Sequence, residues 1–273
     1  MSELEAGSML PELLRIAREA GDIVMQGYRR AITVTKKGAI DLVTEFDLAS
    51  QAHIVAQLSR AYPKLRVVGE EGQRVEGRTD GVLECFVDPI DGTTNFAHGH
   101  PFFCVSLGLC LSGVPLAGVV LAPALGLTWA GSVGVGTTRN AEPCRVSGGD
   151  QLRDALCATG FGYQVVGAED DNLREFGLVQ KRVRGVRRCG AAAIDLALVA
   201  DGTYDAYWEF MLQPWDMAAG CALVLAAGGR ATALDEGPLD VRTGACLASN
   251  GLVHAGLAGL VHEARDGRPV PLR

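Results

Sequence analysis

The chain has 273 residues, of which 48% are hydrophobic, and it carries a formal net charge of −7. This length and apolar content are sufficient to bury a sizeable core in one large domain. The acidic balance disfavours non-specific binding of nucleic acid, which needs a basic surface. It allows a small anionic substrate if a bound cation supplies positive charge locally.

The cysteines and the N-terminal segment indicate neither secretion nor a membrane anchor. None of the eight cysteines forms the C-x-x-C spacing of a zinc or redox motif. The N-terminal segment is acidic and lacks the charge and apolar pattern of a signal peptide. No run of 18 apolar residues occurs, so no membrane-spanning helix is expected. We therefore expect a reduced, cytoplasmic protein with no membrane partner.

Two helices and then several strands are expected in the first half of the chain. Apolar residues recur with helical spacing over residues 9–30 and 45–60. A Ser-Gly-Val-Pro sequence at 112–115 predicts a hairpin turn. The strands expected in this half cover 65–69, 83–88, 105–111, 116–121 and 127–132.

After about residue 150 the pattern changes to alternating strands and helices. Strands are expected over 156–161, 206–209 and 246–249, and helices over 170–184, 191–200, 216–227 and 252–264. Mixed elements of this kind predict layered α/β packing. We expect a single domain over residues 1–273, with approximate halves at 1–149 and 150–273.

The sequence DPIDGTTNF at residues 88–96 places two carboxylates directly after an expected buried strand. Pro89 cannot continue a sheet ladder, so the chain must turn and can bring Asp91 to the side of Asp88. The two carboxylates and the Ile90 carbonyl are hard oxygen ligands that suit Mg²⁺. The N–H groups that follow Gly92 could face an anion if a helix starts there. The simpler alternative is an ordinary Asp-Pro and Asp-Gly turn.

Three further acidic segments lie at the ends of expected elements. Glu70 follows a strand, Asp216 lies where a helix begins in WDMAAG, and the segment DLVTEFD at 41–47 precedes the second helix. Each has a simple alternative, either a solvated turn or an N-cap aspartate. Together with DPIDGTTNF they predict a single cluster of acids.

These four segments resemble, in this order and at similar separations, the motifs of the inositol monophosphatase family. The resemblance runs from about residue 10 to 262 and includes RCGAAA at 188–193, YWE at 207–209 and NFAHGHPF at 95–102. It implies an α/β (α+β) fold, an α-β-α-β-α layered sandwich of the inositol monophosphatase and fructose-1,6-bisphosphatase type. It also implies a Mg²⁺-dependent, lithium-sensitive phosphomonoesterase that forms a homodimer.

The resemblance also implies roles for individual residues. Glu70, Asp88 and the Ile90 carbonyl match the ligands of a first metal, and Asp88, Asp91 and Asp216 match those of a second. A third, weaker Mg²⁺ is implied near Glu70, which gives two to three Mg²⁺ per site.

The remaining matches concern catalysis and the substrate. Thr93, Asp47 and Glu70 match catalytic residues, with Thr93 and Asp47 orienting the attacking water. The N–H groups of Gly92 and Thr93 match phosphate contacts. Ala192 and Glu209 match positions near the alcohol portion of the substrate. Lys36 matches a residue of a mobile loop before DLVTEFD.

Other polar features have simpler interpretations. His98 and His100 are expected to serve in a loop rather than bind a metal. The basic run at 181–188 is either a solvated helix face and strand or a contact surface. Asp195 and Asp205 lack motif support and are interpreted as capping or exposed. The acidic loop at 164–171 is expected to affect substrate specificity.

We therefore expect hydrolysis of inositol 1-phosphate to inositol and phosphate, by in-line attack of a metal-activated water without a phosphoenzyme. Histidinol-phosphate phosphatase, 3′-phosphoadenosine 5′-phosphate phosphatase and fructose-1,6-bisphosphatase are alternatives within the superfamily. A regulatory or RNA-processing accessory protein is the alternative outside enzymes, although the net acidity makes a nucleic-acid partner unlikely.

Overall fold

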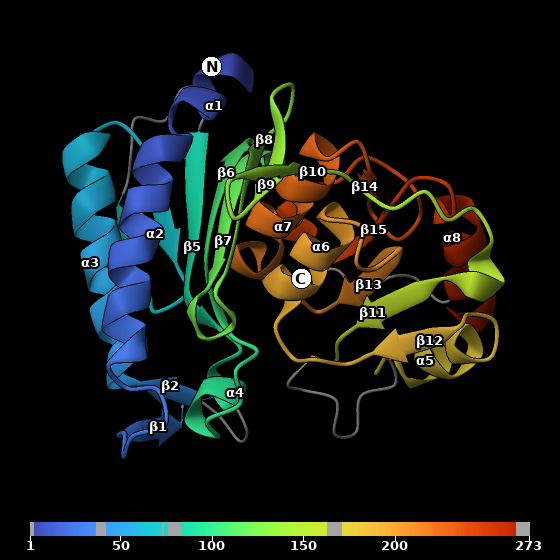
Figure 1. The fold of residues 1–273 in the computed structure, drawn as a ribbon, viewed down its shortest axis with the longest axis horizontal. Coiled ribbons are helices and arrows are strands. Elements are labelled where there is room, and N and C mark those ends of the chain that lie inside the picture. Colours follow the sequence, from blue (N-terminus) through green and yellow to red (C-terminus); the bar gives the residue numbers. More distant parts are fainter. Residues whose placement is uncertain (1–2, 37–41, 73, 76–82, 163–170, 266–273) are drawn as a thin grey trace.

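The computed structural model describes residues 3–36, 42–72, 74–75, 83–162 and 171–265. Its helices and sheets form five alternating layers (Figure 1). One helix pair covers an eight-stranded sheet, a second pair separates that sheet from a five-stranded one, and a third pair lies beyond it. The pairs are α2 (Leu10–Met25) with α3 (Glu45–Ala61), α6 (Ala192–Ala200) with α7 (Pro214–Ala226), and α5 (Leu173–Gln180) with α8 (His254–Arg265). The predicted α-β-α-β-α sandwich is confirmed.

The eight-stranded sheet has the order β10-β9-β8-β7-β6-β5-β3-β4. Its strands are β3 (Arg66–Gly69), β4 (Arg74–Val75), β5 (Leu83–Asp91), β6 (Cys104–Leu111), β7 (Val114–Ala122), β8 (Leu127–Ser132), β9 (Gly136–Arg139) and β10 (Glu142–Cys144). Only the neighbours β3 and β5 run parallel, so their carboxyl ends meet at one edge of the sheet.

The five-stranded sheet has the order β12-β11-β13-β15-β14. Its strands are β11 (Leu156–Thr159), β12 (Gly185–Arg187), β13 (Ala206–Phe210), β14 (Arg230–Thr232) and β15 (Ala245–Ser249). The remaining short elements are α1 (Glu3–Ser8), the pair β1 (Val34–Lys36) and β2 (Leu42–Thr44), α4 (Thr93–Ala97), and the 3₁₀ turns η1 (Pro123–Leu125), η2 (Leu152–Asp154) and η3 (Val241–Thr243).

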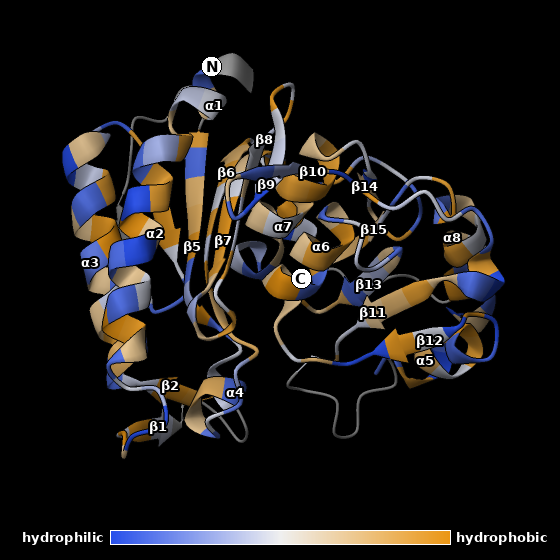
Figure 2. Cartoon of the chain, viewed as in Figure 1, coloured by the Kyte–Doolittle hydropathy of each residue, from blue (hydrophilic) through white to orange (hydrophobic). Residues whose placement is uncertain are grey.

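Apart from Asp195 and Asp216 in their first turns, the central helices α6 and α7 are apolar, because both sheets cover them. Every residue of α6 is buried, whereas α2 and α3 alternate polar and apolar faces (Figure 2). Gly108 of β6 lets α7 approach closely, since a Cβ there would lie 2.5 Å from the Ala218 Cβ and from the Ala219 nitrogen. This packing fixes the position of the α7 N-terminus.

The expected elements agree with the structure, with three kinds of difference. The first main helix ends at Met25 rather than at residue 30. The strand expected to end at Asp88 continues to Asp91, although its register shifts between these two residues, around Pro89. Short strands at the sheet edges, such as β10 and β14, were not predicted. All eight cysteine thiols are free, and among the described residues no helix is long and apolar enough to cross a membrane.

Candidate active site

Three carboxyl groups from distant parts of the chain lie near that of Asp88, where β3 and β5 end and α7 begins. We call Glu70, Asp88, Asp91 and Asp216 the carboxylate cluster. The charges of Glu70, Asp91 and Asp216 all raise the pKa of Asp88, and Glu70 also makes a side-chain hydrogen bond with it. The structure therefore brings together the four acids that the sequence predicted to converge.

Two members of the carboxylate cluster are buried, and the negative charges of its members repel one another. Asp88 is 2% exposed and Asp91 is 8% exposed. Burial is the main reason that the pKa of Asp88 lies well above its ordinary value and that of Asp91 is raised to about 7. Adjacent buried carboxylates cannot all remain charged without a cation to relieve the repulsion.

The donor set fits Mg²⁺. It consists of carboxylate oxygens and, in the turn between Asp88 and Asp91, the Ile90 carbonyl, all of which are hard ligands. Within the described residues, no three His, Cys, Asp or Glu side chains already form a closed metal cage. The charges of Glu70, Asp91 and Asp216 act on Asp88, so the four carboxyl groups are already neighbours and a cation would need only to align them.

The turn after Asp88 is held by its own hydrogen bonds. Asp88 Oδ1 accepts a bond from the Ile90 N–H at 3.0 Å. The Ile90 carbonyl accepts one from the Thr93 hydroxyl at 2.9 Å and keeps a second lone pair. Gly92 lies in the left-handed region with φ 91°, and a Cβ there would be 3.0 Å from the Phe102 carbonyl oxygen. Only glycine suits this position.

Asp47 is fully buried and joins two elements. It accepts bonds from the Thr44 N–H at 2.8 Å and the Thr44 hydroxyl at 2.5 Å, completing the capping box of α3. It also lies 3.0 Å from the Thr93 hydroxyl, which can donate to it. Burial raises the pKa of Asp47, and these hydrogen bonds partly oppose that effect. The N-cap of α3 is therefore Thr44 and not an aspartate, and Asp47 completes the box from the N3 position. The same carboxylate also reaches the DPIDGTTNF turn.

A second wall faces the carboxylate cluster. We call it the α6–β13 wall and define it by Gly160, Gly190, Ala192, Asp195 and Glu209. The Ala193 N–H at the start of α6 donates to Asp91 Oδ2 at 2.7 Å. Glu209 accepts a bond from the Tyr207 hydroxyl, and burial raises its pKa to about 7. The charge of Glu209 raises the pKa of Asp91, so these two carboxyl groups lie near each other.

The sequence analysis was wrong about Asp195 and did not identify Asn95, both of which lie in this region. Asp195, interpreted as capping or exposed, is 2% exposed, and its Oδ1 has no hydrogen-bond partner among the described residues. Asn95 was not singled out, yet its side-chain amide donates to the Phe102 carbonyl at 2.7 Å and the Cys189 carbonyl at 2.9 Å. Asn95 thereby ties the DPIDGTTNF turn to the α6–β13 wall. Its place within that motif was the available signal.

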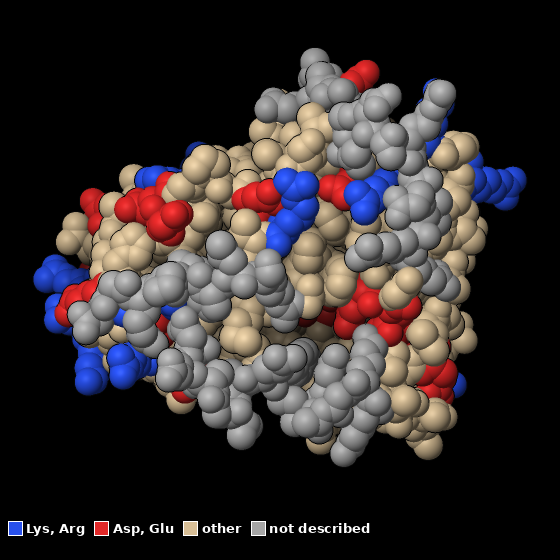
Figure 3. Space-filling model, turned by 180° about the vertical axis from the view of Figure 1, so that it is seen from behind, with Lys and Arg blue, Asp and Glu red and all other residues tan. Residues whose placement is uncertain are grey.

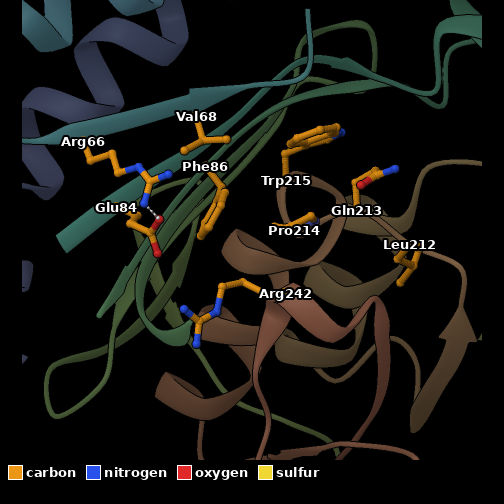
Figure 4. A pocket seen from close by; sticks show the side chains of 9 residues that line it. All are labelled: Arg66, Val68, Glu84, Phe86, Leu212, Gln213, Pro214, Trp215 and Arg242. Atoms are coloured by element: carbon orange, nitrogen blue, oxygen red, sulfur yellow. Dashed lines mark ion pairs between the residues drawn. The ribbon is translucent and has the colours of Figure 1, made fainter. Parts of the chain in front are cut away.

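A pocket of about 330 Å³ lies beside the carboxylate cluster (Figure 4). Val68 and Phe86 line it, and each stands two residues before a cluster member on the same strand face. Trp215, which precedes Asp216, forms part of the opposite side. The ion pair between Arg66 and Glu84, with 3.0 Å between Arg66 Nη1 and Glu84 Oε1, also lines the pocket. On the face turned away in Figure 1, a group of acidic side chains lies beside a hollow (Figure 3).

The structure agrees with some of the remaining predictions from the sequence and differs from others. His98 and His100 are exposed, and Phe102 N–H donates to His100 Nδ1 at 3.4 Å, as expected for a loop. Asp205 is neither a helix cap nor exposed, because it is half-buried and accepts a bond at 2.7 Å from the N–H of Leu156, the first residue of β11. The loop position expected for Lys36 is wrong, because this residue ends β1 opposite Leu42. Residues 41 and 164–170 lie outside the described residues.

Comparison with known proteins agrees with this arrangement. Residues 7–266 match the model of the inositol monophosphatase family. The chain belongs to the inositol monophosphatase family. Enzymes of this family are phosphoric monoester hydrolases that generally depend on a metal, so the predicted enzyme class is confirmed.

The relatives include proteins named as inositol monophosphatases and a protein named as a Nus factor. The chain is 41% identical to the inositol-1-monophosphatase of Synechocystis sp. over 92% of its length and 89% of the relative. It is 44% identical to the Nus factor SuhB of Pseudomonas aeruginosa over 81% of its length and 83% of that protein.

Solved structures of the family share the fold. The inositol monophosphatase of Anabaena (Nostoc) sp. superimposes with a TM-score of 0.86 at 36% identity, covering 95% of this chain and 97% of that one. An inositol monophosphatase called SaIMPase-II, solved with inositol monophosphate bound, gives a TM-score of 0.77 at 26% identity, with 95% of each chain covered.

Proposed function

We propose that this family member hydrolyses a small phosphate monoester with two to three Mg²⁺ per site, and that inositol 1-phosphate is its leading substrate. The products are inositol and phosphate. The observation that carries the proposal is the convergence of Glu70, Asp91 and Asp216 on the buried Asp88. Such a group of repelling acids is stable and useful chiefly when it holds cations.

The carboxylate cluster supplies enough ligands for more than one ion. Glu70, Asp88 and the Ile90 carbonyl would hold a first Mg²⁺, and Asp88, Asp91 and Asp216 a second, with a third near Glu70. Bound Mg²⁺ would make a water nucleophilic and neutralise charge on the leaving oxygen. The protein's own contribution is to keep these donors in a cleft with little water around them.

Thr93 and Asp47 are suited to orient the attacking water. When the Thr93 hydroxyl donates its hydrogen to Asp47 or to the Ile90 carbonyl, its oxygen can accept a hydrogen bond from water. Glu70, which is hydrogen-bonded to Asp88, would fix the same water through the metal site. No side chain needs to act as a covalent nucleophile.

The turn and the α6–β13 wall would hold the substrate. The N–H groups of Gly92 and Thr93 would contact the phosphate, where the glycine leaves no side chain in the way. Glu209 would accept hydrogen bonds from hydroxyl groups of the alcohol portion, next to Ala192. A carboxylate acceptor in this place favours a polyol as the leaving alcohol.

Histidinol phosphate and 3′-phosphoadenosine 5′-phosphate are the alternative substrates, because the same metal ligands of the carboxylate cluster would serve their hydrolysis. The similarity to a relative named as a Nus factor also supports a second candidate, a regulatory or RNA-processing accessory role. The exposed arginines of the run at 181–188 would serve such a role. We further propose a lithium-sensitive, cytoplasmic homodimer.

A phosphate-release screen tests the function. Inositol 1-phosphate, histidinol phosphate and 3′-phosphoadenosine 5′-phosphate are compared with Mg²⁺, with excess chelator and with Li⁺. We expect release from inositol 1-phosphate that stops in chelator and falls with Li⁺. Undiminished release in excess chelator would show that the metal-dependent chemistry is wrong. An Asp91→Asn variant that loses release but keeps a binding role would separate the two candidate functions.

A further inference from the structure

Helix α3 carries three buried polar residues on the face that packs against β3 and β5. Asp47, Ser50 and Gln51 recur at helical spacing and are each at most 1% exposed, whereas the next buried residues of this face, Ile54 and Leu58, are apolar. We call the first three residues the polar stripe of α3. Core packing does not account for it, because burying a polar side chain costs free energy unless it is hydrogen-bonded.

Two members of the polar stripe hold the turn that follows Asp88. Asp47 Oδ1 lies 3.0 Å from the Thr93 hydroxyl, which can donate to it. The Ser50 hydroxyl donates to the Pro89 carbonyl at 3.4 Å. The start of α3 is thereby attached to the segment that carries two acids of the carboxylate cluster.

Gln51 holds the other turn of the cluster, in which Glu70 lies. Its Oε1 accepts a hydrogen bond from the Glu71 N–H, with 2.9 Å between the oxygen and the nitrogen. The same amide group lies against Gly69, since a Cβ there would be 2.4 Å from Gln51 Oε1 and 2.5 Å from its Cδ. The Glu70 N–H donates to the Val87 carbonyl at 3.1 Å. The main chain around Glu70 is therefore fixed by β5 through one N–H and by α3 through the next.

The orientation of the Gln51 amide follows from its bond to the Glu71 N–H. If the amide were turned over, two N–H donors would face each other, because an amide nitrogen does not accept. In the observed orientation Nε2 is buried and has no hydrogen-bond partner in the part of the chain that the structure describes. A buried donor without a partner costs free energy. Only the oxygen of this side chain therefore accounts for a polar residue at this position.

We propose that Gln51 is a positioning residue that presents Glu70 to the cation which Glu70 would share with Asp88. This inference rests on the proposed function and adds to it a residue that is not itself a metal ligand. Without the Gln51 oxygen, residues 69–71 lose their link to α3, and a cation has to order the Glu70 carboxylate as it binds. The affinity for that cation falls, whereas an ion held without Glu70 is affected less.

Binding of Mn²⁺ to the purified full chain tests this inference, with the ion titrated by calorimetry and by electron paramagnetic resonance. Gln51→Met keeps the approximate volume of the side chain and removes the acceptor oxygen, whereas Gln51→Glu keeps an acceptor oxygen in either protonation state. Gln57→Met is the matched control, because Gln57 lies on the same helix and its Oε1 accepts a bond from Arg15 Nη2 at 3.2 Å instead. The melting temperature in chelator is recorded for every variant.

We expect Gln51→Met to weaken Mn²⁺ binding by about three- to tenfold, as for loss of one hydrogen bond. Gln51→Glu should bind Mn²⁺ at least as tightly as the wild type, and Gln57→Met should stay within about twofold of it. In a Glu70→Gln background, Gln51→Met should cause no further loss, because two residues that act as a unit are not additive. A merely structural role of Gln51 would lower the affinity by the same factor in both backgrounds.

Three results would overturn the inference: an unchanged Mn²⁺ affinity in Gln51→Met, an equal loss in Gln57→Met, or an equal loss in the Glu70→Gln background. If Gln51→Met does not fold, Gly69→Ala decides between the same outcomes, because its methyl group would displace the Gln51 amide. Failure of the wild-type protein to bind Mn²⁺ at all would instead overturn the proposed function.

Discussion

The carboxylate cluster and the α6–β13 wall face the same cleft but are built differently. Three of the four acids of the cluster lie at the ends of two adjacent parallel strands, and Asp216 lies in the first turn of a helix locked between two sheets. The wall is assembled from a loop, a helix start and a strand of the other sheet, tied to the cluster by Asn95 and by Asp91. The carboxylate cluster is therefore positioned by the topology of the fold, whereas the α6–β13 wall depends on a few hydrogen bonds for its position relative to the cluster.

The largest expected effect comes from breaking the carboxylate cluster. Asp88→Asn should lower kcat by at least about 10³-fold, because metal ions supply several kcal/mol of charge stabilisation in such reactions. The same change removes one charge from a repelling buried group, so the metal-free variant should melt at the same temperature as the wild type or higher. Initial rates across a Mg²⁺ titration and thermal melts in chelator measure both effects. A catalytically active or strongly destabilised variant would contradict this view of Asp88.

Removing the hydroxyl beside the cluster should have the next largest effect. Thr93→Ala should lower kcat by about 10²-fold with little change in KM, since positioning a water for attack contributes on that order. Thr93→Ser keeps the hydroxyl and should remain within a few-fold of the wild type. Steady-state kinetics on inositol 1-phosphate compares the two. If Thr93→Ser lowers kcat as much as Thr93→Ala, the packing of the threonine methyl group is important rather than its hydroxyl.

A change in the α6–β13 wall should act on the substrate rather than on the chemistry. Glu209→Gln should reduce kcat/KM for inositol 1-phosphate by about tenfold, as expected for loss of a hydrogen bond to a charged acceptor. The rate on p-nitrophenyl phosphate, which has no hydroxyl groups on its leaving alcohol, should change little. An equal loss on both esters would place Glu209 in the metal side of the cleft and remove the distinction between the two walls.

The smallest effect concerns stability. The pKa values of Asp91 and Glu209 are both raised to about 7 from 3.8 and 4.5, so the folded protein binds more protons than the unfolded chain between these values. The stability contributed by these groups is fully present below about pH 4 and is lost as the pH rises through about 7. In chelator, Tm should therefore be about 5 °C higher at pH 5.5 than at pH 8.

Magnesium provides the control for this stability effect. Added Mg²⁺ should raise Tm at pH 8 in the wild type by mass action, and much less in Asp88→Asn. Melting curves at several pH values, with and without the ion, measure this. A Tm that rises with pH in chelator would mean that the buried acids are already compensated by other groups.

The sequence was most informative where function is encoded in short segments. DPIDGTTNF contains the end of a strand, a turn and the start of a helix within nine residues, so Asp88 and Asp91 could be recognised as candidate metal ligands from the local pattern alone. The role of the Thr93 hydroxyl was implied only by the family resemblance. The convergence of Asp216 with Asp88 and Asp91 depended on a resemblance, because nothing local indicates which helix start faces which strand end. Long apolar helices and strands were also predictable, since their periodicity reflects burial.

Other features could not be read from the sequence, for physical reasons. In the sequence, Asp195 looks like an ordinary acidic residue in the first turn of a helix. It is buried only because α6 packs between two sheets. Short edge strands such as β10 have too few residues to show an alternating pattern. The position of Arg188 against Gly190 and Phe161 depends on backbone geometry at a glycine with φ 88°, which the basic run at 181–188 does not reveal.

A crystal structure with Mn²⁺ as an anomalous scatterer tests the central claim most directly. We predict two or three anomalous peaks within coordination distance of Glu70, Asp88, Asp91, Asp216 and the Ile90 carbonyl oxygen, and none of them in Asp88→Asn crystals at the same ion concentration. Peaks located only elsewhere on the surface, or a wild-type cleft without a peak at saturating Mn²⁺, would contradict it.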